Sequence, residues 1–170
     1  MNGDQKTVAV GAASGVVLMA LSVWGLYTVL PDISNVADLA SRLALTLRVN
    51  VFALIPLFVM IATVGNKRFL SNAIDPLRHA EDTAMEVDGR VVDNTLQQQF
   101  VFLVSTLAIS TFLDAASIKL VVALAIVYVA ARIAFWIGYR MHPLYRAPGM
   151  AATSYLNLGI IVAVIYLTLS

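Results

Sequence analysis

The sequence predicts an all-α integral membrane protein, a bundle of five transmembrane helices with almost no soluble part. Of its 170 residues, 60% are hydrophobic and only 12% are charged, and the mean hydropathy is +0.85. A soluble domain carries about 25% charged residues. The apolar residues also gather in five long stretches without strand-like alternation, which favours membrane helices over the strands of a barrel.

The five apolar stretches follow one another with short polar segments between them. They cover residues 8–30, 43–64, 91–113, 118–139 and 151–169. The first has 23 residues without a charge. It spans about 34 Å, enough for a hydrocarbon core of roughly 30 Å. It is too long for the apolar part of a signal peptide, so we expect it to be retained as a helix.

Polar residues and a proline interrupt the second stretch. Pro56 is expected to kink the helix, because proline removes a backbone donor and clashes with the preceding turn. Asn50 is expected to hydrogen-bond between helices. Arg48 either extends to the outer interface or has a functional role, and the first interpretation is favoured.

Residues 65–90 form the one sizeable polar region of the sequence. We expect a cytoplasmic loop whose acidic and basic residues form a solvated surface, with His79 as a surface residue. Two domain segments are expected, an N-terminal helix with its outer loop (1–42) and a four-helix membrane domain (43–170). Gly11 and Gly15 form a GxxxG pair that would allow close helix contact.

The distribution of Lys and Arg predicts the orientation. The N-terminus, the 65–90 region and the 140–149 connector hold seven basic residues: Lys6, Lys67, Arg68, Arg78, Arg90, Arg140 and Arg146. The opposite side holds Arg42 and Lys119. Positive residues favour the cytoplasm, so the N-terminus is predicted inside and the C-terminus outside. We expect the membrane to be a bacterial inner membrane.

Composition excludes several kinds of chemistry. The chain has no cysteine, so a disulfide, a thiolate metal site and a cysteine nucleophile are excluded. Two distant histidines, His79 and His142, argue against a metal site. A net charge of +1 does not indicate a nucleic-acid partner. No Walker loop, nucleophile elbow or HExxH motif is present.

Six polar residues are predicted to lie at the cytoplasmic boundary of the bundle. They are Arg90, Asn94, Gln97, Arg132, Tyr139 and Arg146. The first three share a helix face by their spacing, as do Arg132 and Tyr139. Fixed positive charge with amide and phenol groups suits a small anionic, peptide-like ligand. The alternative is that these side chains only tie helices together or lie at the interface.

Two motifs resemble a known family, the membrane-associated proteins in eicosanoid and glutathione metabolism (MAPEG). The segment DPLRHA at residues 75–80, followed by RVVDN at 90–94, resembles the family's cytoplasmic loop and its second-helix R-x-x-x-N-x-x-E motif. The run ARIAFWIGY at 131–139, with Arg146 beyond it, is similar to the third-helix pattern of members that use glutathione. The resemblance covers roughly residues 43–169 and leaves the first helix as an addition to the usual four.

The resemblance implies a homotrimer that binds glutathione as cosubstrate between neighbouring subunits, near the cytoplasmic face. Arg90, Asn94, Gln97, Arg132 and Tyr139 would contact the tripeptide. Arg146 would be the catalytic residue, because a nearby guanidinium stabilises a thiolate. A lipophilic electrophile would approach from the membrane lipid. The implied activity is that of a glutathione transferase or peroxidase.

The sequence also departs from the family pattern. Gln97 stands where the motif has glutamate, Gln98 replaces a tyrosine of some members, and Phe135 stands where active eicosanoid-type members carry an aromatic hydroxyl or a histidine. These changes favour an alternative, a non-catalytic protein of the same fold that binds a lipid or acts as the membrane partner of another protein. A small transporter or channel is a third interpretation, although no inverted repeat is apparent.

Overall fold

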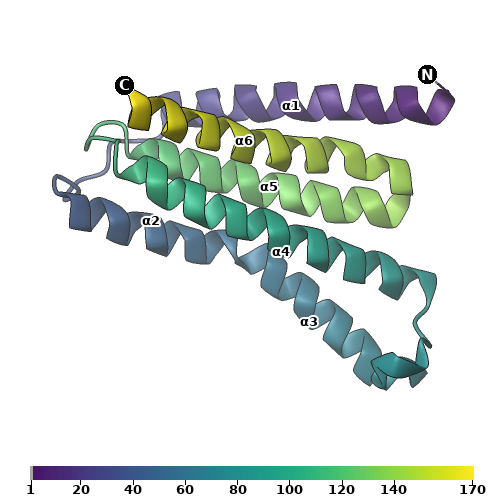
Figure 1. Cartoon of the computed structure of the whole chain (residues 1–170). Coiled ribbons are helices and arrows are strands. Elements are labelled where there is room, and N and C mark those ends of the chain that lie inside the picture. Colours follow the sequence, from purple (N-terminus) through teal and green to yellow (C-terminus); the bar gives the residue numbers. More distant parts are fainter. Residues whose placement is uncertain (1) are drawn as a thin grey trace.

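The computed structural model describes residues 2–170 and consists of one helical bundle (Figure 1). Its α-helices are α1 (Gly3–Val29), α2 (Leu39–Ala53), α3 (Ile55–Phe69), α4 (Thr83–Ser110), α5 (Lys119–Met141) and α6 (Ala147–Leu169). Three short 3₁₀ turns are η1 (Asn72–Ile74), η2 (Pro76–Arg78) and η3 (Pro143–Arg146). Residues 2–170 contain no strand, which confirms the all-α prediction.

Helices α2 and α3 are two halves of one rod, so residues 2–170 form five rods, the predicted number. The rod breaks at Leu54, and Pro56 lies in the first turn of α3, where its missing N–H costs nothing. The predicted kink is confirmed. Within the described part of the chain, four rods are long and apolar enough to cross a membrane: α1, α2 with α3, α5, and α6 with η3. Helix α4 is more polar and packs against α2, α3, α5 and α6.

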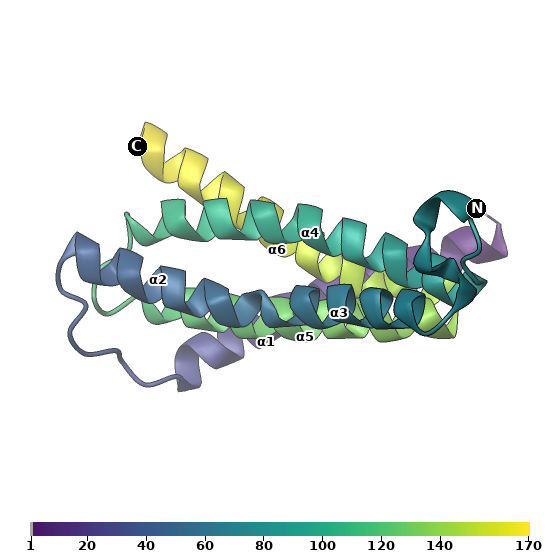
Figure 2. The ribbon, with the colours of Figure 1, turned by 90° about the horizontal axis from the view of Figure 1, so that it is seen from below.

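The two ends of the bundle carry different connections. The N-terminus, the α3–α4 connection and η3 lie at one end, and the C-terminus lies at the other with the α1–α2 and α4–α5 connections (Figures 1 and 2). The first end therefore carries the seven basic residues counted above, and it is called the basic end below. This is the arrangement of chain ends that the distribution of charge predicts.

Helix α4 begins earlier than its apolar stretch. The prediction placed its start at residue 91, whereas the helix starts at Thr83, with Asp82 as N-cap accepting a hydrogen bond from the Met85 N–H at 2.7 Å. Helix α3 also continues to Phe69. The connection between them is therefore residues 70–82 rather than 65–90. Hydropathy marks the apolar part of a helix, but the polar turns beyond the bilayer remain helical when they are capped.

The added helix α1 packs mainly on α6 and, to a lesser extent, on α5. A Cβ atom on Gly15 would collide with the backbone carbonyl of Pro148, and one on Gly11 would press on the Pro148 ring. The GxxxG pair is thus used within the chain, where it brings α1 against the start of α6. At the opposite end Lys119 Nζ lies 2.8 Å from Asp32 Oδ1 and donates to the Leu30 carbonyl.

Candidate functional site

Arg132 lies at the centre of the candidate site and is completely buried. Its Nη1 donates to Thr153 Oγ1 at 3.0 Å, and its Nη2 donates to Asn94 Oδ1 at 3.0 Å and Thr95 Oγ1 at 2.8 Å. Burying a charge is costly unless hydrogen bonds compensate it. Arg132 therefore joins α4, α5 and α6, and its Nη donors serve the fold.

Three predicted site residues are brought together by a ladder of cations and aromatic rings. The Arg132 guanidinium lies 4.1 Å from the Phe135 ring centre, and the Arg146 guanidinium lies 4.8 Å from that of Tyr139. The rings of Phe135 and Tyr139 meet edge to face at 5.9 Å. Each contact is of the kind that attracts a cation to a ring face or pairs two rings. Phe135 thus occupies the middle of the site.

Arg146 differs from Arg132 because it remains available. It ends η3, immediately before α6, and its side chain is half-buried. Among the described residues no carboxylate forms an ion pair with it. Its stacking on Tyr139 positions the guanidinium, and its donors form no hydrogen bond with residues 2–170. This is a fixed cation at the basic end of the bundle.

The three predicted residues of α4 do not all face the same way. Asn94 is half-buried and turned toward Arg132, whereas Arg90 and Gln97 are exposed on the outer side of the helix. Their spacing of four and three residues does place them near one another along the helix. A step of four residues turns about 40° one way around the helix axis, and a step of three turns about 60° the other way. Asn94 therefore lies on the side of this face nearer the bundle, and Gln97 lies on the far side.

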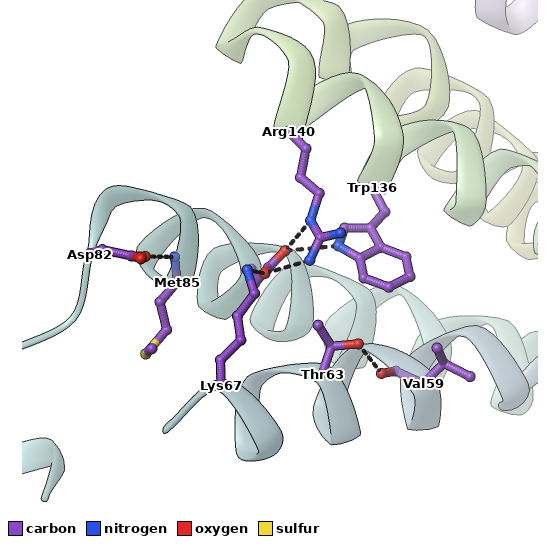
Figure 3. A network of polar contacts seen from close by, with 8 residues as sticks. Val59, Thr63, Lys67, Asp82, Met85, Trp136 and Arg140 are labelled. Atoms are coloured by element: carbon purple, nitrogen blue, oxygen red, sulfur yellow. Dashed lines mark hydrogen bonds and ion pairs between the residues drawn. The ribbon is translucent and has the colours of Figure 1, made fainter. Parts of the chain in front are cut away.

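Sequence reasoning missed a buried ionic cluster at the same end of the bundle (Figure 3). Asp88 of α4 is only 1% exposed and accepts hydrogen bonds from three side chains. They come from Lys67 Nζ at 2.6 Å, Trp136 Nε1 at 2.9 Å, and Arg140 Nε and Nη2 at 2.7 Å each. The cluster joins α3, α4 and α5. The prediction that all charges of residues 65–90 form a solvated surface is wrong for Asp88.

The surroundings of Asp88 keep it ionised. Burial alone would raise the pKa of this carboxyl group, but the hydrogen bonds from Arg140, Lys67 and Trp136 outweigh burial. They hold the pKa of Asp88 far below its usual range. The sequence does contain a signal for this residue, because Asp88, Val91 and Thr95 share the spacing of one buried helix face.

Other amides of the helices have structural partners. Asn157 of α6 donates to the Gln98 carbonyl at 3.1 Å and to Gln98 Oε1 at 2.9 Å. Asn50 of α2 donates to Thr106 of α4 at 3.0 Å. The prediction for Asn50 is confirmed. These bonds engage the side-chain NH₂ groups of Asn50 and Asn157, for which lipid offers no acceptor.

Comparison with known proteins agrees with the residues that carry the resemblance. The family model described as "MAPEG family" matches residues 43–166. The chain is also similar to transmembrane protein 79 of Bos taurus, with 26% identity over 88% of this chain and 37% of that protein. Transmembrane protein 79 of Mus musculus is 24% identical over 77% of this chain and 34% of its own length.

The chain spans about a third of the length of these curated relatives. No solved structure matches it significantly. The family match covers most of the chain, from α2 to the last turns of α6, and includes the Arg132 ladder and the Asp88 cluster. On this basis the chain belongs to the MAPEG family.

Proposed function

We propose that the protein is a glutathione-dependent membrane enzyme, a transferase or peroxidase acting on lipophilic electrophiles. The observation that carries the proposal is the fixed, unpaired guanidinium of Arg146 at the basic end. A cation beside a thiol lowers its pKa and raises the fraction of thiolate at neutral pH. Since the chain has no cysteine, the thiol would come from glutathione.

The neighbouring residues would bind the rest of the tripeptide. Asn94 lies beside Arg132, which holds its side-chain oxygen and leaves its NH₂ group free to donate. Arg90 is exposed one turn earlier and can form paired hydrogen bonds with a carboxylate. Tyr139 would hold Arg146 in place by stacking. Arg132 is then a positioning residue, since its Nη donors are engaged within the protein.

A homotrimer is part of the same proposal, and the outer face of α4 supports it. Six exposed residues follow one another at alternating spacings of four and three: Glu86, Arg90, Asp93, Gln97, Phe100 and Val104. This is the spacing of a helix seam that packs against another helix. Polar side chains facing lipid are costly. Further copies of the chain would cover the seam and place Arg90 and Gln97 at a subunit boundary.

The proposed orientation places the basic end in the cytoplasm, in keeping with the positive-inside rule. Glutathione would then enter from the aqueous side, while the electrophile would enter from the bilayer. The proposed membrane is a bacterial inner membrane. The four apolar rods support the membrane location itself.

A second candidate is a non-catalytic MAPEG protein that binds a lipid or a membrane partner. Phe135 favours it, because a phenylalanine ring supplies neither a hydroxyl nor an imidazole at this position. The ring is 1% exposed and packs against Arg132. Gln97 favours it too, because an amide provides no countercharge for an ammonium group. The matched relatives are named only as transmembrane proteins.

The two candidates are separated by the ultraviolet absorbance of bound thiolate. The purified protein in mild detergent is mixed with glutathione, and conjugation to a generic aryl halide is followed in parallel. We expect a thiolate signal that Arg146→Ala abolishes and Arg146→Lys partly retains. The matched control is Arg78→Ala, which removes an exposed guanidinium at the same end. No thiolate signal and no conjugation by the folded wild-type protein would refute the enzymatic function.

A further inference from the structure

A second site lies on the opposite side of α5 from α1, in a groove between α3 and α5. The groove has a volume of about 320 Å³. Its lining is apolar along its length: Ile55, Pro56 and Val59 from α3, and Val129, Ile133, Trp136 and Ile137 from α5. Arg140 lines the groove at its basic end. The groove therefore combines a hydrocarbon-lined length with a cation at one end.

The groove follows from the break in the α2–α3 rod. Helix α2 packs against α5, whereas α3 contacts it much less. After Leu54 and Pro56 the rod changes direction, and α3 turns away from the rest of the bundle toward the basic end (Figure 1). The side chains that face the gap remain open to lipid, since Ile133 and Ile137 are 43% and 54% exposed. A single straight helix would have packed against α5 and filled this space.

Arg140, which lines the groove, and Lys67, which lies beside it outside the lining, are not fully neutralised. Lys67 and Arg140 share the single carboxylate of Asp88, so the cluster keeps one excess positive charge. Both cations are accessible, with side-chain exposures of 35% and 40%. Asp88 occupies Nε and Nη2 of Arg140 and one donor of Lys67. Arg140 Nη1 and the remaining ammonium hydrogens are left to bind an anion.

Trp136 marks the level of this cation pair along the bundle. Its indole N–H donates a hydrogen bond to Asp88, and the Arg140 guanidinium carbon lies 4.6 Å from its ring centre. The Trp136 side chain also lines the groove. In Figure 3 the ring stands across from Val59 and Thr63 of α3. Tryptophan with one polar and one apolar side is typical of the boundary between headgroups and hydrocarbon. The cation pair thus lies at the level of the lipid phosphates, and the apolar groove lies at the level of the acyl chains.

We propose that this groove binds an anionic phospholipid of the leaflet at the basic end. One acyl chain lies along the groove between α3 and α5, and the phosphate binds Arg140 and Lys67. Basic pockets between transmembrane helices bind anionic headgroups in this way. The site is independent of glutathione and of Arg146.

A larger groove on the other side of α5 provides an internal comparison. It lies among α1, α5 and α6, has a volume of about 560 Å³, and is lined only by apolar residues and Ser22. With no basic residue in its lining, it offers lipid chains a surface but no headgroup contact. We expect lipid in this groove to exchange without preference for headgroup charge.

Native mass spectrometry of delipidated protein tests the proposal. The probes are phosphatidylglycerol and phosphatidylcholine with identical acyl chains. We expect retained phosphatidylglycerol and little phosphatidylcholine. Lys67→Gln removes the excess charge but keeps the Asp88–Arg140 pair, and it should lower the phosphatidylglycerol affinity about fivefold, the effect of one basic residue near an anionic lipid surface. Ile137→Trp fills the groove and should abolish retention.

Leu18→Trp is the matched control, because it places the same ring in the larger apolar groove and should leave phosphatidylglycerol binding unchanged. If Ile137→Trp fails to fold, Val59→Trp fills the groove from α3 instead. Equal retention of the two lipids, or phosphatidylglycerol retention that survives both groove-filling variants, would overturn the proposal. So would full competition by millimolar inorganic phosphate, because the groove would then contribute nothing.

Discussion

Helices α4 and α1 both run the length of the bundle but are held by opposite means. Helix α4 turns polar groups inward: Asp88 binds three side chains of α3 and α5, and Asn94 and Thr95 bind Arg132. Helix α1 has one buried residue, Gly15, and is held by close backbone approach and apolar contact. Helix α4 is therefore held in the core by hydrogen bonds and ion pairs, whereas the added helix α1 is held by close packing.

The contrast indicates how each helix would fail. A hydrogen-bonded charge has few acceptable positions, so α4 keeps one register relative to α3 and α5. Packing in lipid lacks the hydrophobic driving force available in water and depends on small residues that let backbones meet. Loss of a small residue should therefore release α1, whereas loss of a charge should loosen the core itself.

The largest effect is expected from Asp88→Asn. The amide cannot neutralise Lys67 and Arg140, and the stability of the bundle should fall by about 2–4 kcal/mol. Thermal unfolding in mild detergent measures the change. The control Asp75→Asn alters an exposed pair with Arg78 and should change stability by less than about 0.5 kcal/mol. Similar effects for both variants would mean that the buried cluster does not hold α4.

The next largest effect is expected from Gly15→Val. Its side chain would collide with the Pro148 backbone, and overpacking of this kind costs about 1–3 kcal/mol. The variant should expose the 30–38 segment to protease while the rest of the bundle remains folded. Gly25→Val is the control, since nothing lies within 4 Å of a Cβ atom there. If Gly25→Val has the same effect, close approach at Gly15 does not explain how α1 is held.

The polar anchor of α1 should matter less. Lys119 is mostly buried, but its partner Asp32 is 78% exposed, so Lys119→Met should cost no more than about 1 kcal/mol. The loss should add to that of Asp88→Asn, because the two sites lie at opposite ends of the bundle. A double variant measured in the same unfolding assay tests additivity, and strong coupling would contradict the separation of core and added helix.

The smallest effect is expected from pH within the neutral range. The pKa of Asp88 is lower in the folded protein than in the unfolded chain, where it is about 3.9. Its contribution is therefore constant above about pH 5 and is lost as the pH falls toward the folded-state value. The stability difference between the wild type and Asp88→Asn should stay flat from pH 8 to 5 and shrink below pH 4. A difference that shrinks already at pH 6 would rule out this assignment.

The sequence determined the class, the number of rods and the end at which each connection lies. Long apolar runs have one stable form in lipid, and the Pro56 break follows from a missing backbone donor. The spacing of Arg132 and Tyr139 also located one face of the candidate site. These features are local, so they can be derived from neighbouring residues in the chain.

Only the tertiary structure decided which polar residues are engaged and which remain available. Arg132 and Arg146 belong to the same ladder, yet Arg132 donates hydrogen bonds to Thr95, Thr153 and Asn94, whereas the Arg146 side chain forms no hydrogen bond or ion pair with any described residue. Asp88 is likewise distant in sequence from Arg140. Whether a charge is satisfied depends on side chains from other helices, and their approach is fixed by packing of the whole bundle rather than by local spacing.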